Sequence, residues 1–210
     1  RTCPGQYAAA TVGGVEEKET LKRYLKAQRD ALLWKLEGLA EHDLRRPLTP
    51  TGTNLLGLVK HLAGVELGYF GDCLGRPHGE RLPWDDEDAD DNADMWATPQ
   101  ESTASLLALY DRAWAVTESA IDELPLEAPA QVPWWGERGR TTLHTLVVHV
   151  LAETARHAGH ADVVRELIDG SVGHRPGVSN LPEHDAQWWS SYVAGVQRAA
   201  DEAVGPGGQG

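Results

Sequence analysis

The sequence has few of the features that mark several large classes of protein. Only two cysteines, Cys3 and Cys73, occur in 210 residues, so neither a disulfide framework nor a cysteine-based zinc site is supported. No apolar run approaches the roughly 20 residues that a membrane-spanning helix needs, and the first 14 residues lack the apolar core of a signal peptide. We therefore expect a soluble cytoplasmic protein with no membrane partner.

Basic residues are also scarce. Lys and Arg together number 19 against 32 Asp and Glu, which leaves a net charge of -13 and a pI near 5.0. Binding to nucleic acid usually needs a clustered basic face, so we expect no nucleic-acid partner. Phenylalanine occurs once and the β-branched residues are mostly scattered valines, which favours an all-α fold. Eight tryptophans are present, and the pairs at 134–135 and 188–189 are candidates for lining a pocket or capping a core.

Helical spacing of apolar residues predicts four long helices and a shorter one. Their starts rest on capping residues: Asn54 or Thr53 for the second helix, Thr98 with Pro99 and Glu101 for the third, and Thr141 or Thr142 for the fourth. Gly170 is the expected end of the fourth helix. The expected ranges are Val15 to Leu39, Asn54 to about Gly75, Thr98 to about Ile121, Thr142 to Gly170 and Glu183 to Val204.

These helices predict one domain over residues 15–203, with disordered tails at 1–14 and 204–210. The acidic segment 76–96 has no periodicity and reads as a solvated surface loop, because it lacks the glycine and glutamate that an EF-hand requires. A connection of this length permits a crossover instead of simple up-and-down order. We therefore expect a four-helix bundle with a long crossover loop and an extra C-terminal helix.

The fourth predicted helix carries an unusual polar stripe, HVLAETARHAGHADVVREL. At 3.6 residues per turn, one face holds His149, Glu153, Arg156, His157 and His160. The charged residues on the opposite side are Asp162, Arg165, Glu166 and Asp169. The stripe is therefore expected to point into the bundle.

Buried imidazoles and carboxylates need partners, and one metal ion would satisfy several of them at once. Glu153 and His157 are four residues apart, so both can reach one ion, and His61 on the second helix is the candidate third ligand. Glu66 is expected to accept a hydrogen bond from a ligating histidine or to form an ion pair. A satisfied core histidine is the alternative for each single imidazole. His149 and His160 are expected to support a ligand or to face substrate, and the core is the alternative place for His149.

The segments KHLAGVELGYFG, with His61, and HVLAETARHAGHADVVREL resemble the DinB-like four-helix-bundle superfamily. The resemblance covers roughly residues 15–170 and is strongest to the branch of mycothiol-dependent maleylpyruvate isomerase and mycothiol S-transferase. It implies a divalent metal, commonly zinc, held by His61, Glu153 and His157. Glutamate at the first of the two positions four apart is typical of this branch, whereas many other members have histidine there.

A metal with two histidines and one glutamate keeps an open position, where a bound thiol would lose its proton. The first hypothesis is therefore a metal-dependent S-transferase or isomerase that uses a low-molecular-weight thiol, by resemblance mycothiol, to attack a small electrophile. His160 and Arg156 are the candidate catalytic groups, to contact an anionic electrophile or to move a proton. The alternatives are a hydrolase that activates water, a non-enzymatic metal-binding stress protein and a non-haem iron oxygenase. Either a monomer or a homodimer is compatible with the sequence.

Overall fold

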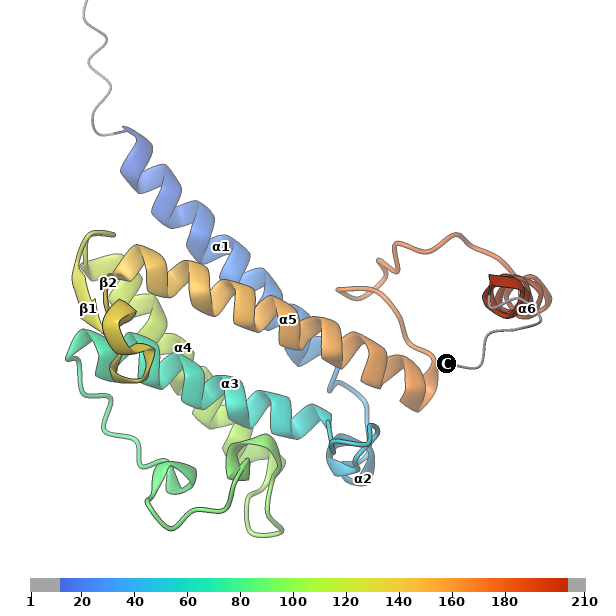
Figure 1. The fold of residues 1–210 in the computed structure, drawn as a ribbon, viewed down its shortest axis with the longest axis horizontal. Coiled ribbons are helices and arrows are strands. Elements are labelled where there is room, and N and C mark those ends of the chain that lie inside the picture. The colour runs from blue at the N-terminus through green and yellow to red at the C-terminus, as the bar shows by residue number, and fades with distance from the viewer. Residues whose placement is uncertain (1–11, 204–210) are drawn as a thin grey trace, which may run out of the picture. The chain divides into compact units, whose positions relative to one another are not determined.

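The computed structural model describes residues 12–203 and is mostly helical, as expected for an all-α protein (Figure 1). Most of the predicted N-terminal tail and the whole predicted C-terminal tail, residues 1–11 and 204–210, lie outside the described residues. Contacts divide the chain into two compact units, one up to Val178 and the other from Ser179. The single domain over residues 15–203 stays a prediction.

Four long helices form the first unit: α1 (Val12–Trp34), α3 (Leu55–Phe70), α4 (Thr103–Glu123) and α5 (Leu143–Asp169). Helix α3 packs against α4 and α5, and α1 packs against α5 and α4, so the four helices enclose one core (Figure 1). That core is built mainly of leucine, valine and alanine, with Tyr110 and Phe70 among its largest buried side chains.

The long connection between α3 and α4 is a crossover, as predicted. Lys60 pairs with Glu101 near the starts of the two helices, and Arg76 pairs with Glu123 near their ends, so α3 and α4 run parallel. The chain must therefore travel back along the bundle between them. By contrast, His61 lies near His157 and Tyr69 lies near His149, so α3 and α5 run antiparallel.

The structure confirms one of the two predicted N-cap residues for each of two helices, and the predicted end of one of them. Asn54 caps α3, where its side chain accepts a hydrogen bond from the backbone N–H of Gly57 at 2.8 Å. Thr142 caps α5, and Gly170 ends it in the left-handed conformation with φ 77°.

The predicted start of the third helix at Thr98 is wrong. Helix α4 begins at Thr103, and Ser102 is its cap. The Glu101 carboxylate does accept from the Thr98 N–H at 2.7 Å, but this contact closes a turn. Arg45 holds that turn through the carbonyls of Thr98 and Glu101, so tertiary contacts keep it outside the helix.

Helix α1 also differs from its predicted range. It begins three residues earlier than predicted and ends at Trp34, and residues 35–38 form turns with i to i−3 hydrogen bonds. A short helix that was not predicted, α2 (Glu41–Arg45), follows between the first and the second predicted helix.

Several short elements were not predicted. The crossover contains the 3₁₀ turns η1 (Asp72–Leu74), η2 (Pro83–Asp85) and η3 (Ala93–Met95). A two-stranded antiparallel ribbon, β1 (Pro129–Gln131) with β2 (Arg140–Thr142), pairs Pro129 with Thr142. The 3₁₀ segment η4 (Pro133–Gly139) joins the two strands.

The second unit contains α6 (Ala186–Ala203), within the predicted range of Glu183 to Val204. Trp188 and Tyr192 stack on this helix with ring centroids 5.3 Å apart and remain largely exposed. Across the described residues, helices long and apolar enough to cross a bilayer are absent.

Candidate metal centre

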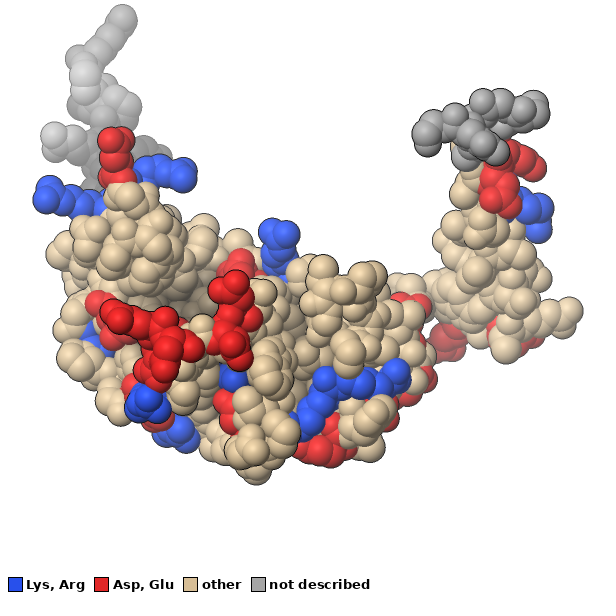
Figure 2. All heavy atoms as spheres, turned by 60° about the horizontal axis from the view of Figure 1, so that its bottom comes forward, with Lys and Arg blue, Asp and Glu red and all other residues tan. Residues whose placement is uncertain are grey.

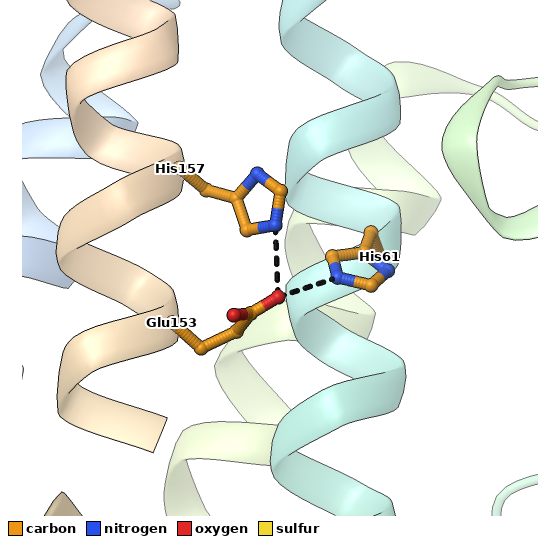
Figure 3. A group of neighbouring side chains, drawn as sticks. All are labelled: His61, Glu153 and His157. Carbon is orange, nitrogen blue, oxygen red and sulfur yellow. Dashed lines mark hydrogen bonds and ion pairs between the residues drawn. The ribbon is translucent and has the colours of Figure 1, made fainter. Parts of the chain in front are cut away.

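The antiparallel packing of α3 on α5 brings His61 opposite Glu153 and His157, one helical turn apart on α5 (Figure 3). Glu153 Oε1 lies 3.0 Å from His157 Nε2 and 3.5 Å from His61 Nε2. The two imidazole rings meet edge to face with centroids 4.8 Å apart. The three residues predicted as metal ligands are therefore side by side, although His61 is about ninety residues away from Glu153 and His157 in the chain.

The outer nitrogen of His61 is fixed by a residue from the crossover. Asp94, in η3, places Oδ2 at 2.6 Å from His61 Nδ1. A proton on Nδ1 donated to this carboxylate leaves the lone pair of Nε2 directed at the Glu153 side. Asp94 thus sets the tautomer in which His61 can act as a ligand.

His157 has a similar outer contact. Its Nδ1 lies 3.3 Å from Nδ1 of His160, one turn further along α5. If His157 donates from Nδ1 and His160 accepts, His157 Nε2 is also left with a lone pair on the Glu153 side. The two imidazoles therefore present the same kind of atom to the same space.

The charges of the group are balanced internally. Burial lowers the pKa of His61, but hydrogen bonds to Asp94 and Glu153 outweigh it and raise the pKa above its ordinary value. Burial and the neighbouring His61 hold the pKa of His157 below its ordinary range. Burial raises the pKa of Glu153, but the two histidines bring it below its usual value. A carboxylate beside a neutral His157 is the form in which these groups coordinate cations.

The donor set fits a divalent metal. One nitrogen or oxygen from each of His61, Glu153 and His157 lies within 4.8 Å of the others. Two imidazole nitrogens and one carboxylate oxygen suit zinc and related divalent ions, and three protein donors leave room for a further ligand. A closed structural centre would have four protein donors and would be buried. This site has three donors, and the Glu153 side chain is 31% exposed.

A cavity of about 580 Å³ opens beside the triad. His61 and Glu153 line it, together with Asp72, Asp85 and Asp94. Figure 2 shows acidic side chains beside a hollow on the face that it brings forward. A small molecule in the cavity would therefore lie directly against two of the three candidate metal ligands, His61 and Glu153.

Aromatic side chains form one wall of this cavity. Trp134, from η4, donates a hydrogen bond from Nε1 to the Tyr69 hydroxyl at 3.2 Å. The His149 ring packs on Tyr69 at 4.9 Å and on Trp135 at 4.8 Å between centroids. His149 therefore lines the cavity, which is compatible with the substrate-facing role predicted for it. The Trp134–Trp135 pair serves both suggested purposes, because Trp134 lines the cavity and Trp135 packs on the core.

The glycines of α3 explain part of the cavity's shape. A Cβ atom at Gly57 would collide with the backbone of Met95, so this glycine permits close approach of the crossover. A Cβ at Gly64 would meet the Trp84 ring at 3.2 Å. At Gly68 a Cβ would meet nothing within 4 Å, so this position contributes open space to the cavity.

The expected orientation of the α5 stripe was only partly right. His157 is buried and Glu153 half-buried, but Arg156 and His160 are exposed. The side taken as solvent-facing is not free either, because Asp162 pairs with Lys35 at 2.8 Å and Arg165 donates to the Lys35 carbonyl at 2.8 Å. The stripe therefore straddles the edge of the buried face, and Lys35, just after α1, contacts the other side of the helix. The described residues that line the cavity include neither Arg156 nor His160.

Glu66 does not hold a ligand histidine, contrary to one of the two roles predicted for it. It is fully buried on another side of α3, 3.5 Å from Arg29 and accepting a 2.9 Å hydrogen bond from the Thr117 hydroxyl. Burial raises its pKa to about 7. The ion-pair role predicted as the alternative is the one the structure shows, with Arg29 as partner.

Sequence reasoning missed Asp94, which was assigned to a solvated acidic loop. Nothing local distinguishes it from its many acidic neighbours in DDEDADDNADMW. The one usable signal is the adjacent apolar Met95, which is half-buried and packs against the core. A loop that sends a side chain into the core is anchored there, so its carboxylates do not all face solvent.

Comparison with known families gives one result that agrees with this geometry. A family model described as "MST: Mycothiol-S-transferase" matches residues 20–170, which contain most of α1 and the whole of α3, α4 and α5. A search of curated proteins finds no match. The matched range includes His61, Glu153 and His157, together with Asp94.

Proposed function

Because the chain belongs to the mycothiol-S-transferase family, we propose that it transfers the sulfur of mycothiol, or of a closely similar thiol, to a small electrophile at a metal held by His61, Glu153 and His157. The observation that carries the proposal is the convergence of these three donors beside a cavity large enough for a small molecule. The matched range contains all three donors, which is consistent with the proposal.

The metal supplies one piece of chemistry: a divalent ion with an open position lowers the pKa of a bound thiol, so that the reactive thiolate exists at neutral pH. Zinc is the ion that the donor set suits best. The chain's own residues supply the remaining parts, which are binding, orientation and the placement of the electrophile.

His61 is held by Asp94 and His157 by His160, so each ligand has a partner that fixes its ring. We assign His160 as a positioning residue for His157, next to its predicted role in proton movement. Arg156 makes no hydrogen bond or ion pair with another described residue, and its contact with substrate stays a prediction. The cavity wall of Tyr69, Trp134 and His149 then faces the electrophile.

The test combines elemental analysis with a transfer assay. The purified protein should contain about one divalent ion per chain and should conjugate mycothiol to 1-chloro-2,4-dinitrobenzene. Chelation should abolish the enzymatic rate, and added zinc should restore it. A His61→Ala variant should lose more than about 100-fold in kcat/KM, since changes to residues that only support a ligand already cost 10–100-fold.

His144→Ala is the matched control, because His144 is a half-exposed histidine near the start of α5 whose ion pair is with Glu17. It should keep full activity. Undiminished transfer by the metal-free protein would refute the proposal. Equal turnover of hydrolysable substrates with and without thiol would favour water activation instead.

A further inference from the structure

Acidic and aromatic side chains line the cavity beside the triad, and their chemistry restricts which molecules can react there. Twelve described residues line it, and neither lysine nor arginine is among them. Four of the twelve are carboxylates: Asp72, Asp85, Asp94 and Glu153. Two of these are already balanced, because Asp94 pairs with His61, and Glu153 lies between the two histidines and would face the metal.

The other two carboxylates are not balanced in this way. Asp85 makes no side-chain hydrogen bond or ion pair with another described residue, and burial together with the nearby Asp94 and Asp72 raises its pKa. Asp72 has only His78, at 3.5 Å, which offsets its charge only when protonated. This side of the cavity therefore carries a negative potential.

The neighbouring cations are engaged elsewhere. The Lys60 ammonium donates to the carbonyls of Ala93 and Trp96 and pairs with Glu101. Arg81 pairs with Asp86. Arg156 is exposed and does not line the cavity. Apart from the proposed metal and its ligand His61, an anionic group on a bound molecule would meet carboxylates and find no lysine or arginine to pair with.

Aromatic side chains also line the cavity. Tyr69 and Trp134 meet at 69° with centroids 5.4 Å apart, and the Trp134 side of this pair is open, since that residue is 60% exposed. The open space at Gly68 lies on the α3 side of the same cavity. Aromatic faces favour flat apolar or cationic groups.

From the acidic and the aromatic residues that line the cavity we infer that the electrophile is a flat, uncharged or cationic molecule, and that Asp72 and Asp85 exclude carboxylate-bearing electrophiles. This inference rests on the proposed function and names its substrate class. It differs from the expectation, drawn from the α5 stripe, that Arg156 receives an anionic electrophile.

The test uses two aryl chlorides of similar size that differ in the charge of the para substituent, 4-chloro-3,5-dinitrobenzamide and 4-chloro-3,5-dinitrobenzoate. In both reactions the mycothiol sulfur bonds to the carbon that bears chlorine, the C–Cl bond breaks, chloride leaves with the bonding electrons and the thiol proton passes to buffer. Because the amide is also intrinsically more reactive, each kcat/KM is divided by the uncatalysed second-order rate constant for the same aryl chloride, and the zinc-loaded protein should show an at least tenfold higher normalised value with the amide. An equal or higher normalised value with the benzoate would overturn the inference.

Variants locate the cause of the preference. The double variant Asp72→Asn/Asp85→Asn should reduce the amide-to-benzoate ratio several-fold. Asp88→Asn/Asp91→Asn, which changes two exposed carboxylates of the same crossover outside the cavity, should leave the ratio unchanged. A ratio that falls equally in both double variants would show that the overall negative charge of the crossover repels the benzoate, and it would refute the specific role of Asp72 and Asp85.

A binding measurement separates this inference from the proposed function. Tryptophan fluorescence quenching gives the Kd of the two preformed mycothiol conjugates, whether or not the protein turns over. Tighter binding of the amide conjugate without any catalysis would uphold the charge preference and refute the transferase. Catalysis with no preference in rate or Kd would uphold the transferase and refute the charge preference.

Discussion

Asp94 is the single residue whose position says most about the centre. It lies 33 residues after His61, in the crossover that joins α3 to α4, and its carboxylate lies 2.6 Å from His61 Nδ1. A carboxylate on the outer nitrogen raises the basicity of the inner one and prevents the ring from rotating. The pKa of Asp94 is lowered by this hydrogen bond, as expected for a carboxylate that stays charged.

Replacing Asp94 with asparagine should weaken zinc binding about 10–100-fold, because the ring loses its charged partner while the three ligands remain. Competition with a chromogenic chelator gives the Kd. Asp91→Asn, an exposed neighbour in the same loop, is the control and should bind zinc like the unaltered protein. An unchanged Kd in the Asp94 variant would mean that His61 needs no support from the crossover.

Among the elements, α3 has two tasks along one glycine-bearing side. Near its start Gly57 lets the crossover backbone come close, and near its end Gly68 leaves space unfilled. The same residue type therefore builds contact at one position and volume at the other. Sequence alone left both readings open, since a small residue permits either.

Gly68→Val should fill part of the cavity while leaving the helix sound. Glycine in a helix interior costs roughly 0.5–1 kcal/mol relative to alanine, so the variant should unfold at the same temperature or slightly higher. We expect kcat/KM with 4-chloro-3,5-dinitrobenzamide to fall at least about tenfold, a loss of roughly 1.4 kcal/mol in transition-state binding. Gly159→Val, at an exposed α5 position where a Cβ also meets nothing within 4 Å, should leave activity unchanged. Equal losses in the two variants would contradict the steric explanation.

For the bundle as a whole, the most informative group is Glu66, because its partners come from different helices. Arg29 on α1 and Thr117 on α4 both contact this fully buried carboxylate of α3. Arg29 also lies over the Tyr110 ring, with Cζ 3.5 Å from its centroid, and pairs with Asp111. A buried ion pair of this kind contributes less to stability than its contacts suggest, since both charges lose water.

The pH dependence of unfolding should report this burial. The folded-state pKa of Glu66 is about 7, above its ordinary value of 4.5, so the folded chain keeps a proton that the unfolded chain releases between these values. Its contribution to stability is full below about pH 4.5 and is lost as pH rises to about 7, by on the order of 3 kcal/mol. Glu66→Gln should lack this component in urea unfolding at pH 5 to 8, whereas exposed Glu87→Gln should retain it. Identical pH profiles for the two variants would refute the raised pKa.

The sequence by itself determined the helical class, the crossover and the end of α5 at Gly170. It narrowed the caps of α3 and α5 to two residues each, and it predicted the trio of His61, Glu153 and His157, which the structure brings together. Helical periodicity, capping side chains and residue spacing are local properties, and they were sufficient except at Thr98, where Arg45 keeps the predicted first turn outside α4. His61 was a candidate from its place on the apolar face of its helix, and the family resemblance strengthened its link to a pair about ninety residues away.

Only the tertiary structure decided which way these residues face. On α5, Asp162 and Arg165 contact Lys35, just after α1, whereas Arg156 and His160 are exposed. The partner of His61 and the charge of the cavity come from the crossover, whose acidic residues look alike in sequence. Contacts between distant segments set the orientation and the local potential of a side chain, so no local pattern could have revealed them.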